Sequence, residues 1–320
     1  MPTQRISVNH HRRSDKKPTR AVHFNFAKLH AALVLRRSAS AIVCTALILV
    51  LGLPVAPSWA APQTTKSDGK LKNIELCNGA DRSSAEPQIR GCTALIDSGN
   101  ETALVLAIAH TNRGNAYTAR GDYDLAINDY DLAVKLNPDF SKPFNNRGVA
   151  FLKKGDYDRA IKDFDEAIRL TPDYARAFAN RAETNQRRHD YQGAARDYDN
   201  AIRLQPDLEA VWNGRCWTRA VLGQLQPALA DCNKALLIQP KDAATFDSRG
   251  LIYLKMGQFD SAIEDYSSAL RLEPKMASAL YGRGLARLKK GDAAGGNADV
   301  AAAKRLQTAV ADDFSRYGVQ

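Results

Sequence analysis

The sequence after residue 60 is poor in the residues that build catalytic and metal-binding sites. It retains two of the chain's six histidines, His110 and His189, and isolated histidines of this kind usually pack or lie at the surface. It contains no glycine-rich phosphate loop, no HExxH or CxxC motif and no nucleophile elbow. These absences predict a protein without enzymatic activity that holds no metal and no cofactor.

An excess of basic charge is also missing from this part. The whole chain has a formal net charge of +10, but residues 1–60 hold nine of its 45 Lys and Arg residues and only one acid, Asp15. Residues 61–320 therefore carry a net charge of about +2, which provides no basic face for a nucleic acid. We expect no nucleic-acid partner.

Residues 1–60 show the pattern of an export signal. A basic region ends at Arg36 and Arg37, an apolar stretch runs over 39–53, and small residues precede the expected cleavage point. The apolar stretch is short for a membrane span, which needs about 20 residues. We predict cleavage after Ala60 and a periplasmic or otherwise exported protein. The alternative is an uncleaved leader that anchors the chain in the inner membrane.

The remaining sequence repeats with a period of 34 residues. Small residues, aromatic residues, a turn glycine and a closing proline recur in one register, and apolar residues follow at steps of three and four. Each unit is thus predicted to form two amphipathic helices around a turn. In the second unit they are expected at about 141–154 and 158–170. The clearest marker of the period is an arginine: Arg113, Arg147, Arg181, Arg215, Arg249 and Arg283.

This period and pattern resemble the tetratricopeptide repeat. The resemblance covers about residues 107–310 and implies an all-α, right-handed superhelical solenoid whose first helices line a concave groove. Asn185, Arg219 and Arg287 depart from it, because the family has an aromatic residue at their position. The six units lie at 107–140, 141–174, 175–208, 209–242, 243–276 and 277–310.

Two flanking segments fit as caps, which a solenoid needs because an end unit otherwise exposes its core. Residues 71–106 are expected to form a degenerate leading hairpin, and residues 311–320 a terminal helix over the last unit. Residues 61–70 have the composition of a polar linker. With its Asn-Arg-Gly units and paired cysteines, the chain resembles exported tetratricopeptide proteins of alphaproteobacteria.

Each repeated arginine is followed 16 residues later by an aspartate. Residues equidistant from the turn of an antiparallel hairpin face each other, and Gly155 lies midway between Arg147 and Asp163. A buried guanidinium needs such a carboxylate partner, although two exposed charges at a coincidental period are the alternative. We predict six structural ion pairs, each within its hairpin or shared with the neighbouring one: Arg113–Asp129, Arg147–Asp163, Arg181–Asp197, Arg215–Asp231, Arg249–Asp265 and Arg283–Asp299.

The same geometry applies to the cysteines after residue 60. Cys216 and Cys232 flank the turn of the fourth unit, and Cys77 and Cys92 flank the turn of the leading hairpin. An even number of cysteines in an exported chain favours disulfides over metal ligation. We expect the bridges Cys77–Cys92 and Cys216–Cys232, with buried free thiols as the alternative.

Polar side chains, asparagines above all, occupy the first-helix positions that would face the groove. An asparagine amide can donate to and accept from an extended peptide backbone. For the asparagines, the alternative is a solvated helix surface without a binding role. For Trp217, the alternative is packing against unit five. In units five and six, Leu251, Leu254 and Leu285 suggest an apolar half. The peptide-groove candidates are Asn112, Asn115, Asn145, Asn146, Arg176, Asn180, Glu183, Asn213, Trp217, Asp247, Leu251 and Tyr281.

Some tetratricopeptide proteins grip a chain-terminal carboxylate with two asparagines and several bases. Asn115, Asn146 and Arg176 match three of those positions, but Thr111 and Asn180 stand where bases are expected, so we do not predict this mode. The sequence predicts a non-enzymatic scaffold or chaperone-like adaptor that binds an extended protein or peptide segment. The alternative is a membrane-tethered envelope assembly factor with the same solenoid. An enzyme would have to assemble its site from separate repeats.

Overall fold

All of the regular secondary structure in the described residues is helical. The computed structural model describes residues 66–81 and 83–319, which contain fifteen helices and no strand, so the predicted all-α class is confirmed. The predicted signal peptide and the start of the predicted linker lie outside the described residues. The helices are α1 (Lys66–Cys77), α2 (Ala85–Asp97), α3 (Ala103–Arg120), α4 (Tyr123–Leu136), α5 (Ser141–Lys153), α6 (Tyr157–Leu170), α7 (Ala175–Arg187), α8 (Tyr191–Leu204), α9 (Glu209–Val221), α10 (Leu225–Ile238), α11 (Ala243–Lys255), α12 (Phe259–Leu272), α13 (Ala277–Lys289), α14 (Ala293–Leu306) and α15 (Val310–Arg316).

Each repeat unit is a helical hairpin, as the second unit illustrates. After α5, Gly155 turns the chain with a φ of 78°, a left-handed conformation that glycine adopts without strain. Asp156 then caps α6, because its side chain accepts a hydrogen bond from the backbone N–H of Arg159 at 3.2 Å. Pro172, just beyond the end of α6, cannot continue the helix. Local residue choice thus places both helix ends.

The two helices of a unit approach closely because a small residue faces an aromatic ring. A Cβ added at Gly148 would lie only 2.7 Å from the ring of Phe164, so this crossing requires glycine. Phe164 is completely buried. Tyr130 in the first unit and Tyr266 in the fifth have at most 1% of their surfaces exposed. Stacking these hairpins joins their separate contacts into a continuous core.

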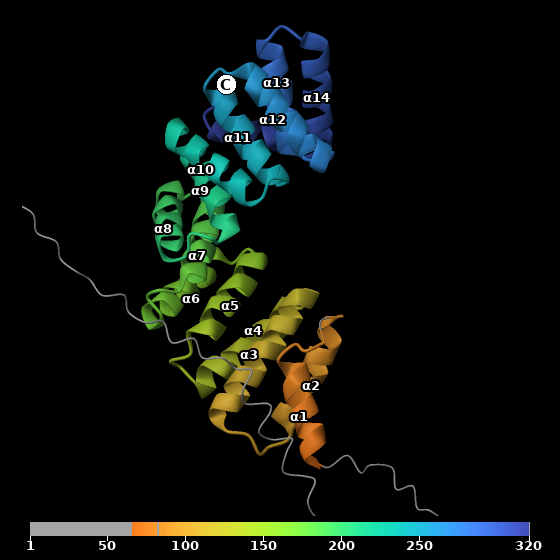
Figure 1. Cartoon of the computed structure of the whole chain (residues 1–320), viewed down its shortest axis with the longest axis vertical. Coiled ribbons are helices and arrows are strands. Elements are labelled where there is room, and N and C mark those ends of the chain that lie inside the picture. Colours follow the sequence, from red (N-terminus) through yellow and green to blue (C-terminus); the bar gives the residue numbers. More distant parts are fainter. Residues whose placement is uncertain (1–65, 82, 320) are drawn as a thin grey trace, which may run out of the picture. The chain divides into compact units, whose positions relative to one another are not determined.

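Neighbouring units stack through consecutive helices (Figure 1). The first helices of adjacent units also contact one another along the series from α3 to α13. In the part of the chain that the structure describes, no two second helices of adjacent units make such a contact. Each pair of neighbouring units is therefore bent toward its first helices. The consecutive stacking of helix pairs confirms the predicted helical solenoid.

The N-terminal end differs from the prediction in two places. The linker expected over 61–70 is wrong for its last residues, because α1 begins at Lys66 and packs against α2 as a leading hairpin. α3 also begins at Ala103, earlier than residue 107, where the first unit is expected to start. The side chain of Thr102 starts α3 by accepting a hydrogen bond from the Val105 N–H at 3.3 Å.

At the other end, α15 packs against α13 and α14. Its residues Val310 and Phe314 are buried, with 1% and 3% of their surfaces exposed, so they cover apolar surface of the last unit. None of the helices in the described ranges combines the length and the apolar composition that a bilayer crossing requires.

Candidate functional site

Each of the six repeated arginines grips the aspartate 16 residues further along the chain. In every unit the arginine Nε donates to Oδ2 and Nη2 donates to Oδ1, at distances of 2.6–2.9 Å. The six aspartates are buried, with 3–7% of their surfaces exposed. Such bidentate pairs add geometric specificity to their attraction. They therefore hold the two helices of each hairpin in one register.

The third guanidinium nitrogen reaches the preceding hairpin, a contact that the spacing argument did not predict. The Nη1 of Arg147 donates to Asp131 at 2.6 Å, and the Nη1 of Arg181 donates to Asp165 at 2.5 Å. The corresponding acceptors for the other four arginines are Thr93, Asp199, Asn233 and Ser267. One guanidinium thus joins three helices. The signal in the sequence was an Asp-x-Asp pattern that recurs with the same period in units one to three.

Burial and pairing act in opposite directions on these groups. Burial pushes the pKa of Asp129 upward, but hydrogen bonds from Arg113 and His110 outweigh it and hold that pKa below its ordinary value. The pKa of Arg147 is raised, chiefly by its hydrogen bonds to Asp163. His110 is buried, with Nδ1 2.8 Å from the Asp129 Oδ1. Its ring therefore belongs to the scaffold of the first unit.

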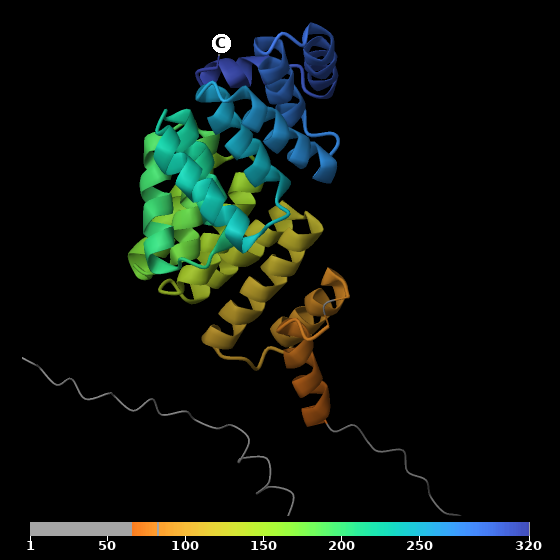
Figure 2. The ribbon, with the colours of Figure 1, turned by 45° about the horizontal axis from the view of Figure 1, so that its top comes forward.

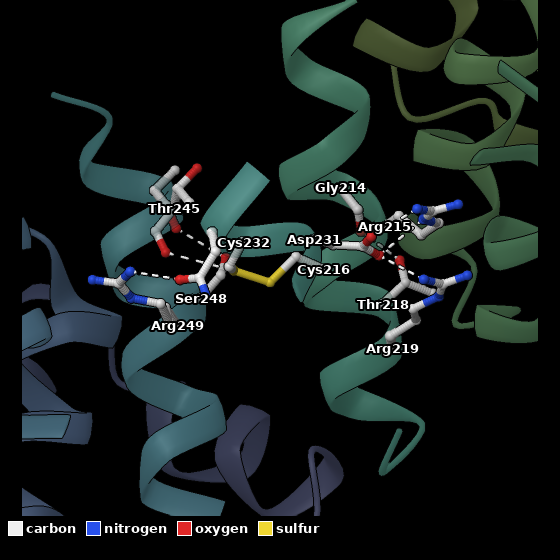
Figure 3. The surroundings of a disulfide bond; sticks show 12 residues. Gly214, Arg215, Cys216, Thr218, Arg219, Asp231, Cys232, Thr245, Ser248 and Arg249 are labelled. Carbon is white, nitrogen blue, oxygen red and sulfur yellow. Dashed lines mark hydrogen bonds and ion pairs between the residues drawn. A yellow bond between two sulfur atoms is a disulfide. The ribbon is translucent and has the colours of Figure 1, made fainter. Parts of the chain in front are cut away.

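Two cysteine pairs lie at disulfide-bonding distance, at the positions that the hairpin geometry indicated. Sγ–Sγ distances are 2.10 Å for Cys77–Cys92, between α1 and α2, and 1.91 Å for Cys216–Cys232, between α9 and α10. Figure 3 shows the second pair beside the cluster of Arg215 and Asp231. On each helix the cysteine directly follows the charged residue. A covalent bond and an ion pair thus join the same two helices at adjacent positions.

The asparagines of the first three units bond to one another. Asn146 donates to Asn115 at 2.7 Å, Asn145 donates to Asn146 at 2.9 Å, and Asn180 donates to Asn145 at 2.9 Å. Tyr130 also donates to the Asn115 carbonyl oxygen, at 2.8 Å. This row of amides runs across α3, α5 and α7. Its members are half-buried except for Asn145, which is buried, so part of their bonding capacity is already used.

Of the groove candidates outside this row, three lie at or near the surface and one is buried in the core. Asn112 donates to Asn78 at 3.2 Å, Glu183 lies 3.6 Å from Arg187, and Arg176 is exposed. Leu251 was wrongly assigned to the groove: it is 3% exposed and belongs to the main core cluster. Leu254 is buried in the same cluster. The helical period brings these two leucines against the neighbouring units, so of the expected apolar half only Leu285 stays half-buried.

Asn213, Trp217 and Asp247 lie together in a pocket of about 510 Å³. The ring of Trp217 meets the rings of Tyr191 and Tyr317 at centroid distances of 5.7 and 5.2 Å, both edge to face. The pocket is lined by residues of α7, α8, α9, α11 and α15, together with His189 and Tyr317. The spacing of first helices pointed to the residues on α9 and α11, but not to Tyr191 and Tyr317.

His189 contributes to this pocket from a strained turn. It has a φ of 64° at the position where the five other units have a turn glycine. A non-glycine residue held in this region costs on the order of 1 kcal/mol, and such strain gathers at functional sites. Its ring Nδ1 lies 3.0 Å from the Tyr191 hydroxyl, next to Trp217. The departure from glycine thus adds a polar aromatic group to the pocket wall.

Two buried acceptor atoms in this pocket have no hydrogen-bond donor within the described ranges. They are the Oδ1 atoms of Asn213 and Asp247, which stand 34 residues apart at the same place in adjacent units. The other Asp247 oxygen accepts from the Ser278 hydroxyl at 2.8 Å. A buried acceptor left without a donor costs about 1–3 kcal/mol. The arrangement is suited to a ligand that brings N–H or O–H donors.

Burial raises the pKa of Asp247 to about 7, and the negative charge of Glu273 acts in the same direction. The carboxyl of the unfolded chain ionises near pH 4. The folded chain therefore keeps a proton there that the unfolded chain has lost, and its stability falls as the pH rises from about 4 to about 7.

Replacing Asp247 with asparagine will abolish this fall, because the amide keeps an acceptor for Ser278 and cannot ionise. We expect the variant to be about 1–3 kcal/mol more stable than the wild type at pH 8 and nearly equal to it at pH 4. Denaturant unfolding at several pH values measures the difference. The exposed Asp312→Asn change is the control, and a gain of the same size at pH 4 and pH 8 would contradict the assignment.

Metal binding has no visible basis in the described part of the chain, where no group of three or more His, Cys, Asp or Glu side chains is placed to hold an ion. The pocket around Trp217 combines rings with neutral and acidic acceptors. The pocket is suited to binding a ligand through hydrogen bonds and ring contacts rather than to coordinating a metal ion.

Family models match parts of the chain. The model described as TPR repeat matches residues 114–155 and 250–291, and the model described as tetratricopeptide repeat matches residues 141–174. The matched ranges fall within four of the six units. No curated protein matches the chain.

Several solved structures share its fold. YrrB, described as a TPR protein with an unusual peptide-binding site, aligns with a TM-score of 0.50 and 20% identity over 60% of this chain and 97% of its own. A tetratricopeptide repeat protein from Parabacteroides merdae aligns with a TM-score of 0.57 and 16% identity over 77% and 99%. A chain of the APC/C hetero-tetramer Cut9-Hcn1 gives 0.61 and 16% over 78% and 52%. The chain is therefore a helical solenoid that contains tetratricopeptide repeats.

Proposed function

We propose that this chain is a non-enzymatic scaffold that holds an extended segment of a partner protein on the face formed by its first helices. Tetratricopeptide repeats and similar folds are consistent with a protein-interaction scaffold. The observation that carries the proposal is the pocket around Trp217, where two buried acceptors lack donors. The peptide-binding site described for YrrB shows that this fold can hold a peptide.

The amide row and the Trp217 pocket supply the two kinds of contact that such binding needs. Amide side chains can bond to the backbone of an extended segment, which confers affinity with little dependence on sequence. A tryptophan in a partly enclosed pocket provides an anchor for one side chain, and truncating such anchors costs about 2 kcal/mol or more. Asn146 and Trp217 therefore test both halves of the surface.

A double variant with Trp217→Ala and Asn146→Ala will lose the partner that the wild type captures from a periplasmic extract. We expect about 30-fold weaker retention, since both contacts lie on the first helices. The matched control is Lys162→Ala with Arg196→Ala, two exposed positions on the second helices α6 and α8. Equal capture by the wild type and the groove variant, with thermal melts unchanged, would contradict the proposal.

We further propose that the scaffold works in the periplasm after cleavage of the leader following Ala60. Disulfides persist in oxidising compartments, and the two bonded cysteine pairs support an exported protein. A membrane-tethered form with the same solenoid is the second candidate, favoured by the apolar stretch over 39–53. N-terminal sequencing of the protein from cells separates them: a start at Ala61 supports release, and residues 1–60 still attached support the tether.

A further inference from the structure

The C-terminal segment does more than cover the last unit. Beyond α15 the chain turns back over the first helices of earlier units, and Figure 2 shows this darkest blue segment against the helices of units five and six. The ring of Phe314 meets the Tyr281 ring on α13 at 5.0 Å. Three residues later, the ring of Tyr317 meets the Trp217 ring on α9 at 5.2 Å. The segment therefore lies across units four to six on the face that we assign to partner binding.

The side chain of Lys255 holds this segment through the segment's main chain. Its ammonium donates to the Tyr317 carbonyl at 2.6 Å and to the Ala220 carbonyl near the end of α9 at 2.7 Å. Burial lowers the pKa of Lys255, and these backbone carbonyls compensate part of that cost. Two aromatic side chains in place and one carbonyl held by a buried donor are the contacts of a bound peptide. The segment occupies the site in the manner of a ligand.

This occupant leaves the site incomplete. The Oδ1 atoms of Asn213 and Asp247 stay buried without donors although Tyr317 lies in the same pocket. The occupant is only partly buried beyond Phe314, because Ser315, Arg316 and Gly318 are exposed and Tyr317 and Val319 are half-buried. Arg316 also lines the pocket, but its guanidinium pairs with Asp313 and leaves the Oδ1 atoms of Asp247 and Asn213 unsatisfied. Segments with few buried contacts open locally at low cost in free energy. A segment that kept both rings and added a donor would satisfy the site better.

We propose that residues 314–319 are a resident competitor in a site that takes a partner segment with two aromatic residues three positions apart and a basic side chain near them. The rings replace Phe314 and Tyr317, the basic group donates to Asp247 and Asn213, and Lys255 donates to a backbone carbonyl of the partner segment. This inference rests on the proposed scaffold function and names the chemistry of its partner. The resident segment lowers the apparent affinity of weak ligands, because they must first displace it.

The test uses a labelled twelve-residue peptide, AVADDFSRYGVQ, copied from residues 309–320. Fluorescence anisotropy measures its binding to the full chain and to the full chain with Tyr317→Ala, which weakens the resident segment but keeps Val310 and Phe314. We expect about tenfold tighter binding to the variant. Ser315→Ala, an exposed change in the same segment, will bind like the wild type. Adding Trp217→Ala to Tyr317→Ala will remove the gain.

A second set of peptides tests the basic group. Lysine replaces Ser315, Gly318, Val319 or Gln320 of the peptide, one at a time. At least one of these will bind the Tyr317→Ala chain about tenfold more tightly than the parent peptide, and Asp247→Asn will remove that gain. Equal binding of the parent peptide to wild type and Tyr317→Ala, or no gain from any lysine, overturns the inference.

The outcomes also separate this inference from the proposed function. If the Trp217→Ala, Asn146→Ala variant loses the partner but no peptide binds the chain, the proposed scaffold function stands. The inference that residues 314–319 are a resident competitor is then overturned. Peptide binding with unchanged capture overturns the proposed partner surface instead. If the wild type forms concentration-dependent dimers and Tyr317→Ala abolishes them, the site binds the C-terminal segment of a second copy. That result would overturn the inference of a separate partner protein.

Discussion

Replacing Asp163 with alanine will destabilise the chain by about 3–5 kcal/mol. The change removes both oxygens that receive the Nε and Nη2 of Arg147, at 2.8 and 2.7 Å. The guanidinium is then left largely buried, bonded only to Asp131 on the preceding hairpin. Breaking one side of a buried ion pair is costly because the remaining charge has lost its partner. Chemical denaturation followed by circular dichroism measures the change.

Two variants show whether the cost comes from the orphaned charge. Replacing both partners with apolar residues of similar size, Arg147→Met with Asp163→Leu, is expected to restore stability to within about 1 kcal/mol of the wild type. Replacing Asp131 alone with alanine is expected to cost about 0–1 kcal/mol, because its carboxylate is more than half exposed. A loss below about 1 kcal/mol for Asp163→Ala would show that the pair does not hold the hairpin.

Removing the Cys216–Cys232 bond will cost about 3 kcal/mol in the chain-entropy treatment, which assigns that value to a loop of about 15 residues. The variant Cys216→Ala with Cys232→Ala tests this, because both positions are completely buried and alanine adds no polar group there. A reductant is expected to lower the melting temperature of the wild type to that of the variant treated with the same reductant. It should leave the variant unchanged except for the effect of the second bond.

The bond between Cys77 and Cys92 provides the matched comparison. It closes a loop of nearly the same length, with a sequence separation of 15 against 16, but it lies in the leading hairpin rather than in an inner repeat. Its loss is expected to open the N-terminal end first, while the loss of the inner bond weakens units on both sides. Hydrogen exchange by region distinguishes the two. A wild-type melt that a reductant does not shift would contradict a stabilising role for either bond.

The 34-residue period was enough to predict both helices of every repeat. Arginine and aspartate at equal distances from a turn must face each other in an antiparallel hairpin, and the structure places the six arginines against these same aspartates. The cysteine pairs follow the same rule. These contacts lie within one hairpin, where a short turn leaves a single way to align two helices.

Contacts between hairpins were not predictable in the same way. Asp131 stands only two residues from the paired Asp129, and although this Asp-x-Asp pattern recurs with the period, it does not show by itself that Asp131 meets Arg147 of the following unit. Leu251 was assigned to the groove on its helix position, but the neighbouring units enclose it. The rotation of one hairpin against the next decides both contacts, and side-chain packing between units sets that rotation.

The sequence by itself determined the repeat, the turn positions and the partners within each hairpin, because these depend on distances of about 16 residues along one chain. Only the tertiary structure decided which surface stays available for binding. Tyr317 comes to lie on Trp217, 100 residues earlier in the sequence, and the Oδ1 atom of Asp247 in the same pocket has no donor among the described residues. Such an arrangement depends on how six units stack, since each rotation between neighbours adds to the last and so fixes where the C-terminal segment ends.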